Sequence, residues 1–235
     1  KKIFVMLGVM SAMLLAALDQ TIVATAMPRI VQEFSSLENL SWVFTAYLLA
    51  STVVVPISGK LSDIYGRKSF YIVAISIFLI GSILSGLAQN MTQLILFRAI
   101  QGIGAGAIMT NSFTIIGDLF PPSERGKWQG LMGGVFGLAS VAGPMLGGWL
   151  TDNASWRWTF FINIPIGVLA LWLILFLMPK IASTLRRSID YLGSVTLTIG
   201  LSTLLLGLVW GGNQYAWGSI QIVGLFLISI VSFFI

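Results

Sequence analysis

The ten residues from Gly59 to Lys68 constrain the fold most, because they place three cationic side chains and one acid between two long apolar runs. Charged side chains are costly inside hydrocarbon, whereas apolar runs of about 20 residues match the thickness of a bilayer. The segment is therefore expected to form a glycine-bounded turn at a membrane surface, with a membrane-spanning helix on either side.

The composition predicts the same class of protein. Hydrophobic residues make up 57% of the 235 residues and charged residues only 9%, against about a quarter in soluble proteins. So few charges cannot solvate a globular surface of this size, which indicates an all-α, polytopic membrane protein. The sequence contains no Cys and no His, so disulfides, Cys/His metal sites and imidazole catalysis are excluded.

Runs without charge predict about eight transmembrane helices. They cover about 4–27, 40–58, 69–89, 93–117, 128–150, 158–178, 191–211 and 219–235. The connection from Pro179 to Asp190 separates six spans from two and carries the pair Arg186–Arg187. We place the one domain boundary there, between residues 1–180 and 181–235.

The cationic side chains predict the orientation in the membrane. Ten of them fall in alternate connections on one side: Lys1, Lys2, Lys60, Arg67, Lys68, Arg125, Lys127, Lys180, Arg186 and Arg187. Arg29 and Arg157 fall on the other side, and Arg98 lies inside a span. Because cationic loops remain in the cytoplasm, we expect a plasma-membrane protein with a cytoplasmic N-terminus. This topology accounts for the net charge of +5, so nucleic-acid binding is not expected.

Two charged side chains lie inside predicted spans. Asp19 is about 22 Å into the first span and Arg98 about 8 Å into the fourth, which enters from the opposite face. In a core of about 30 Å these depths coincide, so the two can pair if their helices are neighbours. Such an acid is a candidate functional site, because alternation between wet and dry surroundings loads and releases a proton. The alternatives are a purely structural bridge, or an Arg98 that extends to the membrane surface.

Glycines mark the fourth and fifth predicted spans. They are Gly102, Gly104 and Gly106 in the fourth span, and Gly130, Gly133, Gly134, Gly137, Gly143, Gly147 and Gly148 in the fifth, with Pro144 among them. Small residues four apart allow close helix packing, and proline bends a helix. The pattern predicts tight packing, either alone or together with a bending fifth helix that seals and opens a cavity.

The segment from Gly59 to Lys68 also predicts a latch between helices. Asp63 and Arg67 lie one helical turn apart, and Asp118 ends the fourth span on the same side. An Arg67–Asp118 bridge would join two helices at the cytoplasmic surface and contribute about 0–1 kcal/mol if solvated. The alternative is a solvated loop that is placed by topology alone.

Five stretches of the sequence resemble motifs of one family. They are Leu18–Pro28 (LDQTIVATAMP), Gly59–Lys68 (GKLSDIYGRK), Leu96–Gly102 (LFRAIQG), Gly143–Gly148 (GPMLGG) and Trp156–Gly167 (WRWTFFINIPIG). In this order and spacing they resemble the major facilitator superfamily, and more narrowly its 14-helix drug:proton antiporter branch of bacterial multidrug exporters. The last two spans lie where that branch inserts two helices between its six-helix halves.

The resemblance implies a six-helix domain of two inverted three-helix repeats, two linker helices, and a chain truncated before a second six-helix half. Such proteins export amphipathic, often cationic compounds in exchange for protons, by alternating access around a midplane cavity. That cavity is expected to be lined by aromatic and Met side chains. Small amphipathic substrates, the lipid bilayer and the missing half are the expected partners, with protons as coupling ion, no cofactor or metal, and a monomeric state.

The resemblance also assigns roles to residues. Asp19 would handle protons, while Arg98 would adjust its proton affinity with the help of Gln101. The motif of Gly143, Pro144, Gly147 and Gly148 would shape the fifth helix at the cavity. Gly59, Asp63, Gly66, Arg67 and Asp118 would form the cytoplasmic latch.

Two other functions remain open. The same fold could export one dedicated metabolite, lipid or peptide, which a narrow substrate profile would indicate. The chain could instead be a non-transporting membrane scaffold or sensor, or a membrane enzyme. We expect no enzyme, because the sequence offers no His, no Cys and no clustered acids as catalytic groups.

Overall fold

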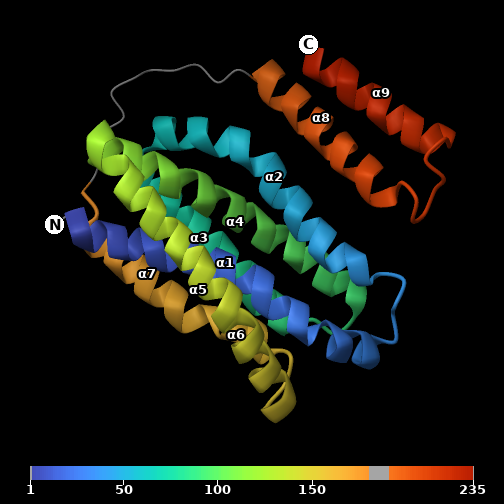
Figure 1. Cartoon of the computed structure of the whole chain (residues 1–235), viewed down its shortest axis with the longest axis horizontal. Helices are drawn as coiled ribbons and strands as arrows, with labels where there is room; N and C mark the ends of the chain where they lie inside the picture. The colour runs from blue at the N-terminus through green and yellow to red at the C-terminus, as the bar shows by residue number, and fades with distance from the viewer. Residues whose placement is uncertain (1, 180–190, 235) are drawn as a thin grey trace.

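A computed structural model describes residues 2–179 and 191–234 of the chain, and these fold into α-helices (Figure 1). The helices are α1 (Lys2–Phe34), α2 (Leu40–Tyr65), α3 (Arg67–Gly86), α4 (Met91–Leu119), α5 (Pro122–Asn153), α6 (Trp158–Phe161), α7 (Asn163–Leu177), α8 (Tyr191–Trp210) and α9 (Ile220–Phe234). Among the described residues, strand-like pairing is limited to an isolated bridge between Gly211 and Tyr215. The prediction of an all-α fold is confirmed.

Seven of the described segments are long and apolar enough to cross a membrane, with α6 and α7 counted together as Trp158–Leu177. The short helix α9 is apolar but has 15 residues. The interruption between α6 and α7 falls at Ile162, whose backbone keeps helical torsion angles. Pro165 follows three residues later and cannot donate to the carbonyl of Phe161, so the span continues with one irregular turn.

Helices α1 and α4 form the centre of the bundle. α1 packs against α4, α5 and α7, while α4 lies between α2 and α3. Figure 1 shows α8 and α9 as an antiparallel hairpin beside α2. Trp42 of α2 meets Trp210 of α8 edge to face, with ring centroids 6.0 Å apart. The predicted domain boundary at Pro179–Asp190 lies almost wholly outside the described residues.

The alternate glycines of α4 explain how this helix fits between two neighbours. A Cβ at Gly102 or Gly106 would lie 2.4 or 2.2 Å from backbone oxygens of Tyr47 and Ser51, both on α2. A Cβ at Gly104 would lie 2.4 Å from the backbone nitrogen of Phe78 on α3. Residues two apart point to nearly opposite sides of a helix, so the three glycines let backbones approach on both sides of α4.

The predicted ten-residue turn at Gly59–Lys68 is wrong in its extent. α2 continues to Tyr65 and α3 begins at Arg67, so Gly66 alone separates them. Gly66 has φ 87°, a left-handed conformation that glycine adopts without a steric penalty. The prediction ended the helix where the hydrophobic run ends. A helix forms its backbone hydrogen bonds within itself, however, so it can continue from lipid into water. For the same reason α1 runs past Pro28 to Phe34.

Cationic side chains cap helix ends at the predicted cytoplasmic surface. Lys68 Nζ donates to the carbonyls of Leu175 and Met178 at the end of α7, at 2.7 and 2.8 Å. Lys2 Nζ donates to Leu119 at the end of α4, at 2.8 Å. The last carbonyls of a helix have no partner within it and carry partial negative charge. The cations that predict topology therefore also stabilise these ends.

We expect Gly104→Ala to lower the free energy of unfolding by about 1–3 kcal/mol, because the new methyl group overpacks against the backbone of α3. Thermal unfolding in detergent would measure this. Gly117→Ala is the matched control in the same helix, since a Cβ there would meet no described atom within 4 Å. It should be neutral or stabilise by up to about 1 kcal/mol through helix propensity. Equal effects of both substitutions would contradict the packing argument.

Candidate functional site

The predicted contact between Asp19 and Arg98 is confirmed. Arg98 Nη1 donates to Asp19 Oδ2 between α4 and α1. The side chains are 1% and 0% exposed for Arg98 and Asp19, so the ion pair lies in a water-excluded part of the bundle. A buried charge is tolerated when it is paired and its remaining hydrogen-bonding groups are satisfied.

Three further groups satisfy this ion pair. Gln101 lies one turn after Arg98 on α4, accepts from Arg98 Nη1 at 2.9 Å and donates to Asp19 Oδ1 at 2.8 Å. The Tyr47 ring of α2 faces the guanidinium at 4.1 Å from the ring centroid, a favourable cation–π arrangement. Arg98 Nε also donates to the backbone oxygen of Val43 at 3.5 Å. Arg98 is thereby held from two helices besides its own.

Besides Tyr47, sequence reasoning missed two side chains of this network, Asn163 and Ser82. Asn163 Nδ2 donates to Asp19 Oδ1 at 3.2 Å and to Ser82 Oγ at 3.0 Å, and both residues are fully buried. They lie on α7 and α3. Neutral polar side chains barely disturb a hydropathy pattern, and the sequence does not show which helix faces they occupy. The available signal was Asn163 itself, a polar residue within the apolar run Phe160–Ile166.

The predicted bridge between Arg67 and Asp118 is confirmed as a contact. Arg67 Nε donates to Asp118 Oδ2 of α4 at 2.9 Å, and Nη2 pairs with Asp63 of α2. Arg67 also donates to Ser62 Oγ and to the carbonyl of Gly59 at 3.4 Å. The side chain of Arg67 is only 14% exposed. The guanidinium thus joins the ends of α2, α3 and α4, as its planar fork of donors allows.

The residues of the predicted fifth-helix motif, which lie on α5, have two different kinds of surroundings. A Cβ at Gly143 would lie 2.0 Å from Thr21 Oγ1, and one at Gly147 would lie 2.1 Å from Thr25 Oγ1. Thr21 Oγ1 also donates to the backbone oxygen of Ala139 on α5 at 3.0 Å. These two glycines therefore bring α5 against α1, next to Asp19.

The remaining motif residues do not make this contact. Pro144 is exposed, and a Cβ at Gly148 would meet no described atom within 4 Å. The same open surroundings apply to Gly130, Gly133, Gly134 and Gly137. Among these glycines of α5, close contact within the described chain is therefore confined to Gly143 and Gly147. Helix α5 remains continuous through Pro144.

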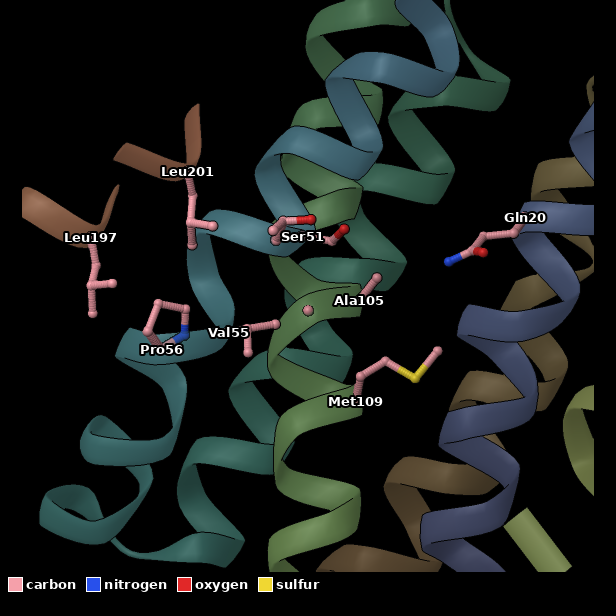
Figure 2. Close-up of a pocket in the computed structure, with 10 residues that line it drawn as sticks. Gln20, Ser51, Val55, Pro56, Ala105, Met109, Leu197 and Leu201 are labelled. Atoms are coloured by element: carbon pink, nitrogen blue, oxygen red, sulfur yellow. The ribbon is translucent and has the colours of Figure 1, made fainter. Parts of the chain in front are cut away.

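A pocket of about 370 Å³ lies among α1, α2, α4 and α8 (Figure 2). Its lining consists of Gln20, Ser51, Thr52, Val55, Pro56, Ala105, Gly106, Met109, Leu197 and Leu201. Figure 2 shows Gln20 and Met109 approaching it from α1 and α4. This pocket has a single Met and no aromatic or charged side chain in its lining. The aromatic and Met lining expected for a midplane cavity between two six-helix halves stays a prediction. Asp19 precedes Gln20 in sequence but points into the buried network.

A second charged cluster lies at the opposite end of the bundle from the latch. Glu33 at the end of α1 accepts from Trp156 Nε1 at 2.6 Å and from Arg157 Nη1 at 2.8 Å. Arg157 Nη2 also donates to the backbone oxygen of Ala88 at 3.0 Å. The cluster fixes the two loops before α4 and α6 to α1. Among the described residues, no three acids, His or Cys come together as a metal site.

Comparisons with known proteins fit this geometry. The family profile of the Major Facilitator Superfamily matches residues 9–235. Multidrug resistance protein 3 of Bacillus subtilis is 50% identical over 98% of this chain and 45% of its own length. The rubrofusarin-specific efflux pump aurT of Gibberella zeae is 40% identical over 97% of this chain and 43% of its own length. The chain thus spans less than half the length of these relatives.

Solved structures share the fold at low sequence identity. The crystal structure of a D-xylose-proton symporter superposes with a TM-score of 0.69 at 19% identity, covering 98% of this chain and 66% of that chain. The human organic anion transporter MFSD10 gives a TM-score of 0.70 at 17% identity, covering 94% of this chain and 58% of that chain. At these identities the likeness concerns the helical architecture alone.

We expect Arg98→Met to lower the free energy of unfolding by about 3–5 kcal/mol, because it leaves the buried Asp19 carboxylate without its cation. Adding Asp19→Asn to this variant should recover part of the loss, since no unpaired charge then remains. Thermal unfolding of the single and double variants would measure the coupling. Simple additivity of the two substitutions would show that the ion pair does not govern stability here.

We expect Arg67→Lys to lower the free energy of unfolding by about 1–2 kcal/mol, because an ammonium cannot bind Asp63, Asp118 and the Gly59 carbonyl at once. Combining it with Asp118→Asn should add little, since both changes disrupt one network. Arg29→Lys, an exposed cation at the other end of the bundle, is the control and should stay within about 0.5 kcal/mol. A similar loss in both Arg→Lys variants would argue against the latch.

Proposed function

Since the chain belongs to the Major Facilitator Superfamily, we propose that it serves proton-coupled export of amphipathic, in part cationic, drugs by alternating access. The observation that carries the proposal is the ion pair of Asp19 and Arg98, fully buried among apolar helices. A charge in such a place is costly, so a role beyond packing accounts best for its presence. Family membership also agrees with the expectation that the chain is not an enzyme.

Asp19 is the group that we propose to carry the proton. Arg98 and Gln101 hold its carboxylate in the sealed arrangement. If the bundle opens this network to water on one side of the membrane, the carboxyl can exchange its proton there, and closing prevents leakage. Thr21 ties the same turn of α1 to α5, so relative movement of these helices would change the surroundings of Asp19.

The substrate class is inferred from the relatives and the pocket. One relative bears the name of a multidrug resistance protein. The pocket of Figure 2 offers mostly apolar surface together with the polar side chains of Gln20, Ser51 and Thr52, which suits amphipathic molecules. Because the chain spans under half of its relatives, we propose that a further six-helix half completes the substrate cavity.

Orientation and assembly belong to the same proposal. The latch of Arg67 and the cap formed by Lys68 lie together at one end of the bundle, and cationic clusters favour the cytoplasmic side. We therefore place the N-terminus in the cytoplasm and the protein in the plasma membrane. Protons are the coupling ion, and the complete exporter acts as a monomer.

Export of one dedicated metabolite is the second candidate. It is favoured by the relative aurT, whose name describes a rubrofusarin-specific efflux pump. Transport assays with chemically unrelated amphipathic dyes distinguish the two candidates. Several unrelated substrates would support multidrug export, whereas a single accepted compound would support dedicated export.

We expect Asp19→Asn in the full-length protein to bind substrate but to abolish drug-stimulated proton release, because the amide cannot titrate. Proton release from vesicles, measured with a pH-sensitive dye beside substrate binding, tests this. Asp152→Asn removes an exposed acid at the C-terminal end of α5 and should leave proton release unchanged. Undiminished release by Asp19→Asn would move the proton site elsewhere and reduce Asp19 to a structural partner of Arg98.

A further inference from the structure

Asn163 links the acid of α1 to two other helices through one continuous hydrogen-bonded chain. Its Nδ2 donates to Asp19 Oδ1 at 3.2 Å and to Ser82 Oγ of α3 at 3.0 Å. Ser82 Oγ then donates to the backbone oxygen of Phe160 in α6 at 2.8 Å. All four residues are fully buried, so water does not compete for these bonds.

The orientation of the Asn163 amide matches an ionised carboxylate. Both of its N–H groups are used, while Asn163 Oδ1 is buried and has no hydrogen-bond partner among the described residues. An unused buried carbonyl is unfavourable. A protonated Asp19 would present an O–H donor, for which a carbonyl oxygen is the matching acceptor. The amide therefore has a group available for each protonation state of its neighbour.

We propose that Asn163 is a positioning residue of the proton site, which donates to the ionised Asp19 and accepts from the protonated one. This rests on the proposed proton coupling. A proton from the aqueous phase binds Asp19 Oδ1, the amide turns so that Oδ1 of Asn163 accepts the new O–H, and Arg98 stays on Asp19 Oδ2. This rotation of the amide breaks the hydrogen bond from Nδ2 to Ser82 Oγ. A change in the protonation of Asp19 on α1 therefore alters a contact that links α7 to α3 and α6.

Few other groups compete for this role. Among the described residues, the titratable side chains that face Asp19 are Arg98 of α4 and Tyr47 of α2, whose ring lies against the guanidinium. Helices α3, α5, α6 and α7 place no charged side chain in the network. Gln101 also donates to Asp19 Oδ1, but its Oε1 is already bound by Arg98. Asn163 is the amide in this network whose carbonyl is unused.

The test compares Asn163→Leu with Asn111→Leu in the full-length protein. Asn111 is also a buried amide in a span with an unpartnered Oδ1, but its Nδ2 bonds only to Ala107 in its own helix. Drug-stimulated proton release from vesicles is recorded as a function of pH. We expect Asn163→Leu to move the midpoint by about one unit toward higher pH, because the charge-assisted hydrogen bond lost by the ionised carboxylate is stronger than the neutral one lost by the protonated acid. Asn111→Leu should leave the midpoint in place.

Each outcome decides the inference. An unmoved midpoint in Asn163→Leu, or an equal movement in Asn111→Leu, would overturn it. If Asn163→Leu does not fold, Ser82→Ala gives the answer, since it removes the anchor of the amide without touching Asp19. In Ser82→Ala, a shift of the midpoint toward higher pH that is smaller than one unit supports the inference, and an unmoved midpoint overturns it. If wild-type protein itself releases no protons, the proposed function fails first and the inference falls with it.

Discussion

The buried ion pair between Asp19 and Arg98 is the interaction on which the rest of the structure depends. Two opposite charges in an apolar bundle are stable only while they touch and while every remaining polar atom has a partner. This requirement forces α1 and α4 into contact at one level of the membrane. It also draws polar side chains from α2 and α7 to the same point, among them Tyr47 and Asn163.

Close backbone packing makes this arrangement possible. Gly102, Gly104 and Gly106 let α4 approach α2 and α3 so closely that a single methyl group would collide with backbone atoms. At Gly143 and Gly147 a methyl group would instead collide first with the side-chain oxygens of Thr21 and Thr25 on α1. In a membrane, helices gain little from burying apolar surface against each other, so contact distance and interhelical hydrogen bonds decide the packing. The glycines thus let the helices that carry the charged network lie close together.

The two ends of the bundle are fixed by different means from its centre. At the latch, Arg67 binds groups from α2 and α4 in partly solvated surroundings, where each pair is weak alone. At the opposite end, Glu33 and Arg157 join loops to α1. Contacts of this strength can be broken and remade, as the proposed alternating access would require. Under the proposed function, the central network would instead rearrange through a change in the protonation of Asp19.

Much of the site was predictable because charge inside hydrocarbon is conspicuous. Depth allowed Asp19 and Arg98 to pair if their helices are neighbours, and loop position matched Arg67 to Asp118; both contacts are present. Their roles in proton coupling and gating remain predictions. Asn163 lies within a quoted motif but received no role, because the sequence does not show which groups its amide contacts. The turn at Gly59–Lys68 was drawn too long, because hydrophobicity marks the membrane boundary and not the end of a helix.

The sequence by itself determined the all-α class, the apolar spans and the family, because these follow from composition, periodicity and local motifs that do not depend on distant contacts. Only the tertiary structure decided which glycines meet a neighbour and which face open space, since that depends on helix rotation. It also decided that Asp19 of α1 is held by side chains of α4 and α7. The pocket beside α8 proved to be lined by aliphatic and uncharged polar side chains and one Met. Rotation and contact arise from packing many residues at once, and no local pattern records them.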